Sequence, residues 1–201
     1  MKTAELPDAV NQAIESLATG DKAEVSAAYY SLLVPILGEE GCLRTDLPRE
    51  VEWADPVWVR FVALLDHEDN HVRSIAGQML SNLAQSADPK TVIRDLDKIV
   101  AVTRDEKFVT ARHVLQSLWK VGLGDEDLRK ATLSKLSKRF KDSSADKNTT
   151  LIRFDIVVGL RALYDAIGNE KVREVAVELI SLEGDEKYRK KYARVWSDLR
   201  D

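Results

Sequence analysis

The sequence contains little of what several common protein classes require. Its one cysteine, Cys42, excludes an internal disulfide, as is typical of proteins in a reducing compartment. Nine glycines, five prolines and 6% aromatic residues disfavour an architecture of many strands and tight turns. No window approaches the roughly 18 uncharged apolar residues of a membrane span. The opening MKTAELPDAV lacks the apolar core of a signal peptide, so we expect a cytoplasmic protein with no membrane segment.

Charged and aliphatic residues make up most of the chain. Among its 201 residues, 32% are charged and 44% are hydrophobic, which is typical of a folded, helix-rich protein with a continuous core. The charge is unevenly distributed. Residues 1–70 hold 5 Lys and Arg against 14 Asp and Glu, whereas residues 71–201 hold 25 against 20. This polarity can orient a charged partner without identifying it.

One apolar spacing recurs along the chain. Val72, Ala76, Met79, Leu80 and Leu83 follow the spacing i, i+4, i+7, i+8 and i+11, which places them on one face of a helix. The same register, at intervals of 35 to 47 residues, recurs from four further positions: Val25, Lys107, Ile152 and Tyr188. A period in this range predicts a stacked solenoid of helices.

A first helix is predicted before each of these second helices. Asp55-Pro56 and Asp88-Pro89 are interpreted as an N-cap followed by proline at the first helical position, where its missing N–H is harmless. Three further first helices are expected near Pro7, Asp125 and Asn169. The acidic segment 38–56 is interpreted as a long loop, and the polar segment 141–150 as a flexible turn. The chain is then one domain, residues 1–201, of helix pairs 6–38, 55–86, 88–122, 125–167 and 169–200.

A known repeat family carries a similar pattern. The run Asp69-x-x-Val72-Arg73-x-x-Ala76-x-x-Met79-Leu80 resembles the second helix of HEAT repeats, and the Asp-Pro openings are similar to their first helices. The resemblance extends over almost the whole chain. It implies an all-α fold, a right-handed α-α superhelix of about five HEAT-like helix pairs. Armadillo-like stacking is the nearest alternative.

Polar residues flank the apolar register at repeated positions. Residues of N-cap type precede the register by three positions, namely Asp69, Thr149 and Asp185. Three arginines follow its first position by one residue, namely Arg73, Arg153 and Arg189. We expect them to have a structural role, bonding to the next repeat, rather than to bind a ligand. The pattern departs at Lys107, a usually apolar position, and at Phe108, which replaces the arginine.

No residue pattern specifies an enzyme, a cofactor or a metal site. His67 and His71 stand four residues apart, a spacing that can hold a metal on one helix. If Asp69 caps the helix, however, His67 lies in the preceding turn. His113 has no Ser-His-Asp or Cys-His arrangement around it, and no glycine-rich phosphate loop is present. Cys42 has no nearby histidine or basic cluster to activate its thiol, so we expect an ordinary loop cysteine.

A nucleic-acid hypothesis stands as the main alternative to a protein-binding scaffold, and a subunit or lyase-like accessory factor that acts on a cofactor-bearing protein is a third, weaker option. Some HEAT-like DNA glycosylases hold a damaged nucleotide with a tryptophan, a carboxylate and basic residues. By residue type, Trp119, Asp155, Arg112 and Arg161 match such a set. Basic clusters at residues 129–141 and 187–194 could also displace counterions from phosphates. The isoelectric point near 5.5 is low for that role, and a solvated helix face is the preferred interpretation of both clusters.

The expected binding surface is the concave side of the array, which second helices usually line. Positions six and nine residues into the register, with their polar neighbours, define a predicted strip: Gln78, Ser81, His113, Gln116, Trp119, Lys120, Arg161, Asp165 and Arg194. A long strip of mixed polarity suits a peptide or protein surface better than a small molecule. The leading hypothesis is therefore a non-catalytic scaffold that binds a partner protein there, without cofactor or metal.

Overall fold

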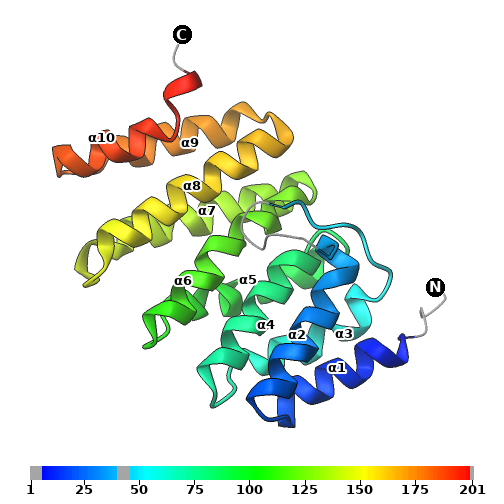
Figure 1. Ribbon diagram of the computed structural model, residues 1–201. Helices are drawn as coiled ribbons and strands as arrows, with labels where there is room; N and C mark the ends of the chain where they lie inside the picture. Colours follow the sequence, from blue (N-terminus) through cyan, green and yellow to red (C-terminus); the bar gives the residue numbers. More distant parts are fainter. Residues whose placement is uncertain (1–5, 40–45, 200–201) are drawn as a thin grey trace.

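The computed structural model describes residues 6–39 and 46–199, and its regular structure there is entirely helical (Figure 1). The first helices of the pairs are α1 (Asp8–Thr19), α3 (Ala54–Leu64), α5 (Pro89–Val102), α7 (Glu126–Asp142) and α9 (Glu170–Ser181). The second helices are α2 (Lys22–Leu37), α4 (Asn70–Leu83), α6 (Phe108–Ser117), α8 (Thr149–Ile167) and α10 (Glu186–Arg194). Short 3-10 helices follow as η1 (Leu118–Leu123), η2 (Ser143–Ala145) and η3 (Ser197–Leu199).

The helix pairs stack side by side into a solenoid (Figure 1). The second helices form one layer, in which α4 contacts α6 and α6 contacts α8. The first helices form the other layer, in which α5 contacts α7 and α7 contacts α9. Buried apolar residues from both layers form one continuous core. The chain is an all-α solenoid of HEAT-like or armadillo-like helix pairs. No helix in the described part of the chain is both long and apolar enough to cross a lipid bilayer.

Side-chain caps begin many of these helices where the sequence predicts them. Asp69 accepts a 2.7 Å hydrogen bond from the amide of His71 at the start of α4. Asp88 accepts one of 2.9 Å from the amide of Thr91 at the start of α5. The same arrangement starts three more helices, at Asp125, Asn169 and Asp185. These bonds satisfy amides that have no partner within a first helical turn, so a local sequence signal suffices to place them.

Two of the predicted caps are wrong. Helix α3 begins at Ala54, so Asp55 lies inside its first turn instead of preceding it. The carboxylate of Asp55 instead accepts a 2.7 Å hydrogen bond from the amide of Asp88, which ties the start of α3 to the start of α5. Thr149 is the first residue of α8, and the residue before it occupies the N-cap position.

The two segments that interrupt the repeat differ in structure. Residues 141–150, predicted to be a flexible turn, are largely helical, because α7 extends to Asp142 and η2 follows it directly. The segment 38–56 lies partly outside the described residues, as does Cys42. Its later part is bound to the second pair, where the amide of Val51 donates a 3.1 Å hydrogen bond to the hydroxyl of Ser86.

Glycines allow neighbouring second helices to approach closely. A Cβ atom added to Gly77 of α4 would lie 2.6 Å from a methyl carbon of Val114 in α6. A Cβ atom added to Gly159 of α8 would lie 3.4 Å from the Cβ of Trp119 in η1. Val114 and Trp119 are both buried. The spacing of the second-helix layer is therefore set by these glycine contacts.

Candidate binding surface

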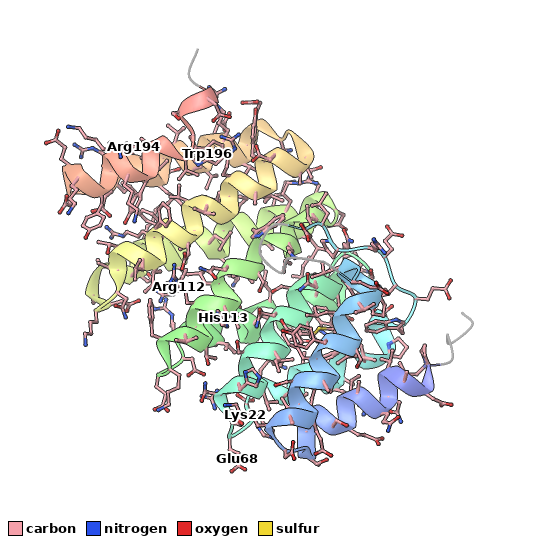
Figure 2. All side chains as sticks on the ribbon, in the orientation of Figure 1. Lys22, Glu68, Arg112, His113, Arg194 and Trp196 are labelled. Carbon is pink, nitrogen blue, oxygen red and sulfur yellow. The ribbon has the colours of Figure 1, made fainter. Side chains whose placement is uncertain are left out.

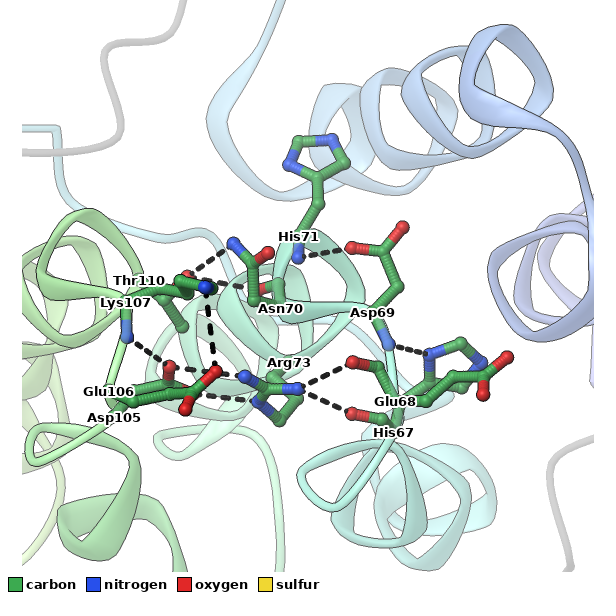
Figure 3. A network of polar contacts seen from close by, with 10 residues as sticks. All are labelled: His67, Glu68, Asp69, Asn70, His71, Arg73, Asp105, Glu106, Lys107 and Thr110. Carbon is green, nitrogen blue, oxygen red and sulfur yellow. Dashed lines mark hydrogen bonds and ion pairs between the residues drawn. The ribbon is translucent and has the colours of Figure 1, made fainter.

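An arginine joins the turns of the second and third pairs (Figure 3). The Nε of Arg73 lies 2.7 Å from a carboxylate oxygen of Asp105, and its Nη1 donates to the carbonyls of His67 and Glu68. Burial raises the pKa of Asp105, but hydrogen bonds from Arg73 and from the amide of Lys107 outweigh this effect and hold that pKa below its usual value. The predicted structural role of Arg73 is confirmed.

The other arginines at this register position have the same role. The Nη1 of Arg153 in α8 lies 3.0 Å from the carboxylate of Glu183, between α9 and α10. The Nη1 of Arg189 in α10 donates a 3.0 Å hydrogen bond to the backbone carbonyl of Glu183. Arg153 therefore joins the last two pairs, as predicted, whereas Arg189 is bonded to the turn within its own pair.

Arg112 and Asp155 form an ion pair in place of an open catalytic site. In the third pair Phe108 replaces the usual arginine, and Arg112, one turn later, bonds to both carboxylate oxygens of Asp155 at 2.7 and 3.1 Å. Gln116 donates a 3.0 Å hydrogen bond to the same carboxylate. Trp119 is 1% exposed, so its ring cannot stack on a nucleotide. The glycosylase-like set is therefore not assembled, although two of its members meet.

The exposure predicted for three residues of the strip is wrong. Ser81, Trp119 and Lys120 are at most 1% exposed, and the Nζ of Lys120 donates a 2.8 Å hydrogen bond to Asn82. Ser81 lies within α4, where its hydroxyl donates a 2.9 Å hydrogen bond to the carbonyl of Gly77. For Trp119 and Lys120 the reason is a change of helix type after Ser117, where α6 gives way to the 3-10 helix η1. A 3-10 helix has about 3.0 residues per turn instead of 3.6, so extrapolating the α-helical register misplaces the side chains of Trp119 and Lys120.

Residues of the strip near the C-terminal end are joined to one another. The Nε of Arg161 lies 2.7 Å from Asp165, and its Nη atoms lie 2.5 and 2.8 Å from the carboxylate of Asp198. The guanidinium also lies 5.7 Å from the ring centre of Trp196. Arg194 is exposed and forms no ion pair with the described residues. Of these two arginines, Arg194 is therefore the one that is available to a partner.

A hollow of about 180 Å³ opens between α2, α4 and α6. It brings together three residues of the predicted strip, Gln78, His113 and Gln116, although Gln78 is only 7% exposed. The other lining residues are Tyr29, His71, Ser74, Ile75 and Ser117. Figure 2 shows Arg112 and His113 on α6 and Arg194 on α10, all on the side of the array that the second helices form.

Sequence reasoning missed part of this hollow. Tyr29 occupies an apolar position of the register, which predicts a plain core residue. Ser74 lies two residues into the same register, a position that the predicted strip does not include. Two features of the sequence could have indicated the hollow: Tyr29 carries a hydroxyl at a core position, and Ser74 lies on the helix that faces it.

The histidine pair does not form a metal site. The Nδ1 of His67 accepts a 3.1 Å hydrogen bond from the amide of Asp69, and its Nε2 lies 3.3 Å from the carbonyl of Ala18. The ring of His71 is turned away from this network (Figure 3). Among the residues that the structure describes, no group of three or more His, Cys, Asp or Glu side chains is placed to hold a metal ion.

The basic cluster of α7 is engaged with carboxylates and carbonyls of the same protein. On α7, Arg139 is 2% exposed and donates to the backbone carbonyl of Thr103. The lysines of α7 form ion pairs, namely Lys130–Glu126, Lys135–Asp97, Lys138–Asp142 and Lys141–Glu178. A phosphate backbone would compete with these carboxylates, so the pairs favour a solvated helix face over a nucleic-acid interface.

Comparisons with known proteins agree with the fold. No protein-family model matches the sequence, and no curated protein matches it. An engineered protein of known structure is similar at a TM-score of 0.55 and 18% identity, over 94% of this chain and 80% of that one. A second engineered protein has a TM-score of 0.50 and 16% identity, and this chain spans 47% of it. A structure of computationally designed armadillo repeat proteins for modular peptide recognition has a TM-score of 0.47 and 16% identity, with coverage of 92% and 79%. At these identities the likeness shows the fold alone.

Proposed function

We propose that this chain is a non-catalytic scaffold that binds an extended segment of a partner protein along its second-helix face. The observation that carries the proposal is the hollow to which α2, α4 and α6 of three successive pairs contribute. At about 180 Å³ it lies below the roughly 300 Å³ at which pockets for small molecules begin. It is the right size for one side chain of a longer ligand, and solenoids present extended surfaces to such ligands.

The rest of the second-helix face supports the same proposal. Its helices expose apolar side chains, with Tyr30 at 69%, Val109 at 63% and Val158 at 41%. Arg194 adds an exposed cation on α10. Aromatic residues and arginine are enriched in protein–protein interfaces, whereas lysine and glutamate are depleted there.

The non-catalytic part of the proposal rests on how the candidate groups are engaged. The carboxylate of Asp155 is paired with Arg112, and the guanidinium of Arg161 is paired with Asp165 and Asp198. Such pairing leaves these groups poorly suited to move a proton or to attack a substrate. The cytoplasm remains our proposed location, because a chain with one cysteine suits a reducing compartment.

The experiment begins with capture of the partner from the native cell extract, with and without nuclease, and its identification by mass spectrometry. The purified partner is then titrated against Val158→Asp and Arg194→Glu, which alter the second-helix face. The matched control is Val177→Asp on α9, where a valine of similar exposure, 55% against 41%, lies in the other layer.

We expect each change on the second-helix face to weaken binding at least about tenfold, because burying a new or unpaired charge at an interface costs more than about 1.4 kcal/mol. Val177→Asp should leave the affinity unchanged. Equal weakening by Val177→Asp, or no effect of Val158→Asp, would contradict the proposed surface. Recovery of nucleic acid, with the partner lost after nuclease treatment, would favour the nucleic-acid alternative.

A further inference from the structure

Helix α10 carries three cations that no carboxylate of the described residues neutralises. Lys187, Lys191 and Arg194 are exposed and form no ion pair within the described part of the chain. They stand at positions i, i+4 and i+7, so they share one face of the helix. These three residues are called the α10 cation row below. The lysines of α7 differ from them, because each of those lies beside a carboxylate.

The carboxylates that lie near the row in sequence are engaged elsewhere. Asp185 caps α10, and the carboxylate of Glu186 lies 2.6 Å from the Nζ of Lys190. The other two carboxylates between positions 183 and 198 are paired with arginines of α8, namely Glu183 with Arg153 and Asp198 with Arg161. The row therefore has cations to offer and no counter-ion from its own surroundings.

The row adjoins an apolar part of the second-helix face. The Nζ of Lys191 lies 4.3 Å from the ring centre of Phe154 in α8. Such a contact holds the ammonium in place and leaves it charged. Val158 follows Phe154 by four residues, so it lies on the same side of α8, where it is 41% exposed. A ligand on the row can thus reach apolar groups as well as cations, as a peptide with mixed side chains would.

The small number of cations favours a peptide over a nucleic acid or a membrane. Proteins that bind nucleic acids commonly contact about six to ten phosphates, and polybasic segments that bind membranes carry about four to eight Lys and Arg. The row supplies three. The protein also has a net charge of -4, which repels a long polyanion at a distance. A short stretch with two or three carboxylates matches the row without this cost.

We infer that the α10 cation row binds an acidic stretch of the partner segment, with two or three Asp or Glu side chains. Helix α10 contacts α8, and α8 contacts α6, which borders the hollow. Two steps of about 8–10 Å between helices correspond to about five or six residues of extended chain. The acidic stretch should lie that far from the residue that enters the hollow. This spacing rests on the proposed function, whereas the preference of the row for carboxylates can be tested without it.

The test uses the capped peptide Glu-Gly-Glu-Gly-Glu as the probe and Gln-Gly-Gln-Gly-Gln as its uncharged control. Each is titrated into the full ¹⁵N-labelled chain at an ionic strength of about 0.02 M and followed by two-dimensional NMR. We expect the glutamate peptide to bind in the millimolar range, to shift the amide signals of α10, and to bind more weakly as salt is added, because exposed ion pairs are weak and screened. No shift of these signals, or equal shifts with the glutamine peptide, would overturn the inference.

Two further probes distinguish the classes of anion. A thymidine tetranucleotide carries three phosphate charges, the same number as the glutamate peptide. If it binds through α10 more tightly than the peptide does, the row is a nucleic-acid contact. If vesicles that contain phosphatidylserine bind the chain and Lys191→Gln abolishes that binding, the row is a membrane contact. Either result would overturn the assignment to an acidic peptide.

Variants of single lysines show whether the row is the site. Lys187→Gln and Lys191→Gln should each weaken binding of the glutamate peptide about threefold and change the thermal midpoint little, since an exposed ion pair contributes less than a tenfold change. The matched control is Lys171→Gln on α9 of the same helix pair, where the Nζ already lies 2.8 Å from Glu174. Equal weakening by Lys171→Gln would show a diffuse attraction and refute the inference.

The two proposals can fail separately. If the glutamate peptide does not bind but the captured partner still depends on Val158, only the assignment of the row is lost. If the peptide binds through the row but Val158→Asp has no effect on the partner, the proposed binding face is lost and the carboxylate site remains.

Discussion

Replacing Gly77 by alanine tests how closely α4 and α6 pack. The added Cβ would lie 2.6 and 2.9 Å from the two methyl carbons of Val114, which is closer than packed carbon atoms come, so one helix must shift. Overpacking a buried contact costs about 1–3 kcal/mol, whereas alanine in place of glycine inside a helix gains about 1 kcal/mol. We expect a net loss of about 1 kcal/mol, or a fall in Tm of about 2–4 °C for a chain of this size.

Val114→Ala supplies the second arm of a double-mutant cycle. Val114 is fully buried at 0% exposure, so losing two methyl groups should cost about 2 kcal/mol. In that background the nearest atom to an alanine at position 77 is the Cβ of residue 114 at 3.3 Å, which a shift of a few tenths of an ångström relieves. Gly77→Ala should then stabilise the protein by about 1 kcal/mol, because the gain in helix propensity remains and the clash is gone.

The decisive result is a change of sign in the effect of Gly77→Ala on the free energy of unfolding between the two backgrounds. Urea unfolding of the four proteins, followed by circular dichroism, gives the four free energies of the cycle. Gly184→Ala is the control for a glycine-to-alanine change without a contact, since no atom lies within 4 Å of its added Cβ. If Gly77→Ala stabilises the unaltered chain, or has the same sign in both backgrounds, then α4 and α6 are not as close as the structure places them.

Two buried carboxylates give further tests. Hydrogen bonds, above all from Arg94, lower the pKa of Asp95 to about 2, so its contribution to stability is complete above pH ~4 and is lost as the pH falls towards 2. Asp95→Asn should reduce the dependence of stability on pH in that window and lower the free energy of unfolding at pH 7 by about 1–2 kcal/mol. Thermal melts across pH measure both effects, and an unchanged acid profile would contradict this prediction. Arg73→Ala leaves Asp105, 5% exposed, without its main partner and should cost about 3 kcal/mol in urea unfolding. Arg73→Lys should recover only part of this loss, because lysine cannot form the bidentate contact, and full recovery would show that charge alone matters.

The repeat and most of its caps could be predicted because their causes are local. An apolar register at helical spacing and an aspartate one residue before a helix act within a few residues of the chain. The end of α6 could not be predicted in this way. The change to η1 accompanies packing between distant segments, such as Gly122 against Leu163, where an added Cβ would lie 2.8 Å from a leucine methyl carbon. For this reason the burial of Trp119 and Lys120 could not be predicted from the residues next to them in the sequence.

The candidate site, like the fold, could be predicted from the sequence only in part. The register places Gln78, His113 and Gln116 on one side of their helices, and the hollow does gather these three. It does not indicate that Tyr29, from a pair 40 to 90 residues away, lines the same hollow with an unsatisfied hydroxyl. Whether a polar group is satisfied depends on all elements that meet around it, which no single helix pattern describes.

The substitution of Phe108 for arginine has a consequence for the mechanics of the array. Arg73 of α4 joins the second and third pairs, and Arg153 of α8 joins the fourth and fifth. The second helices of the third and fourth pairs are joined through Arg112 and Asp155, to which Gln116 also bonds. Gln116, which lines the hollow, and the ion pair that joins two repeats are thus parts of one hydrogen-bonded chain. A bend between α6 and α8 would therefore displace a residue that lines the hollow.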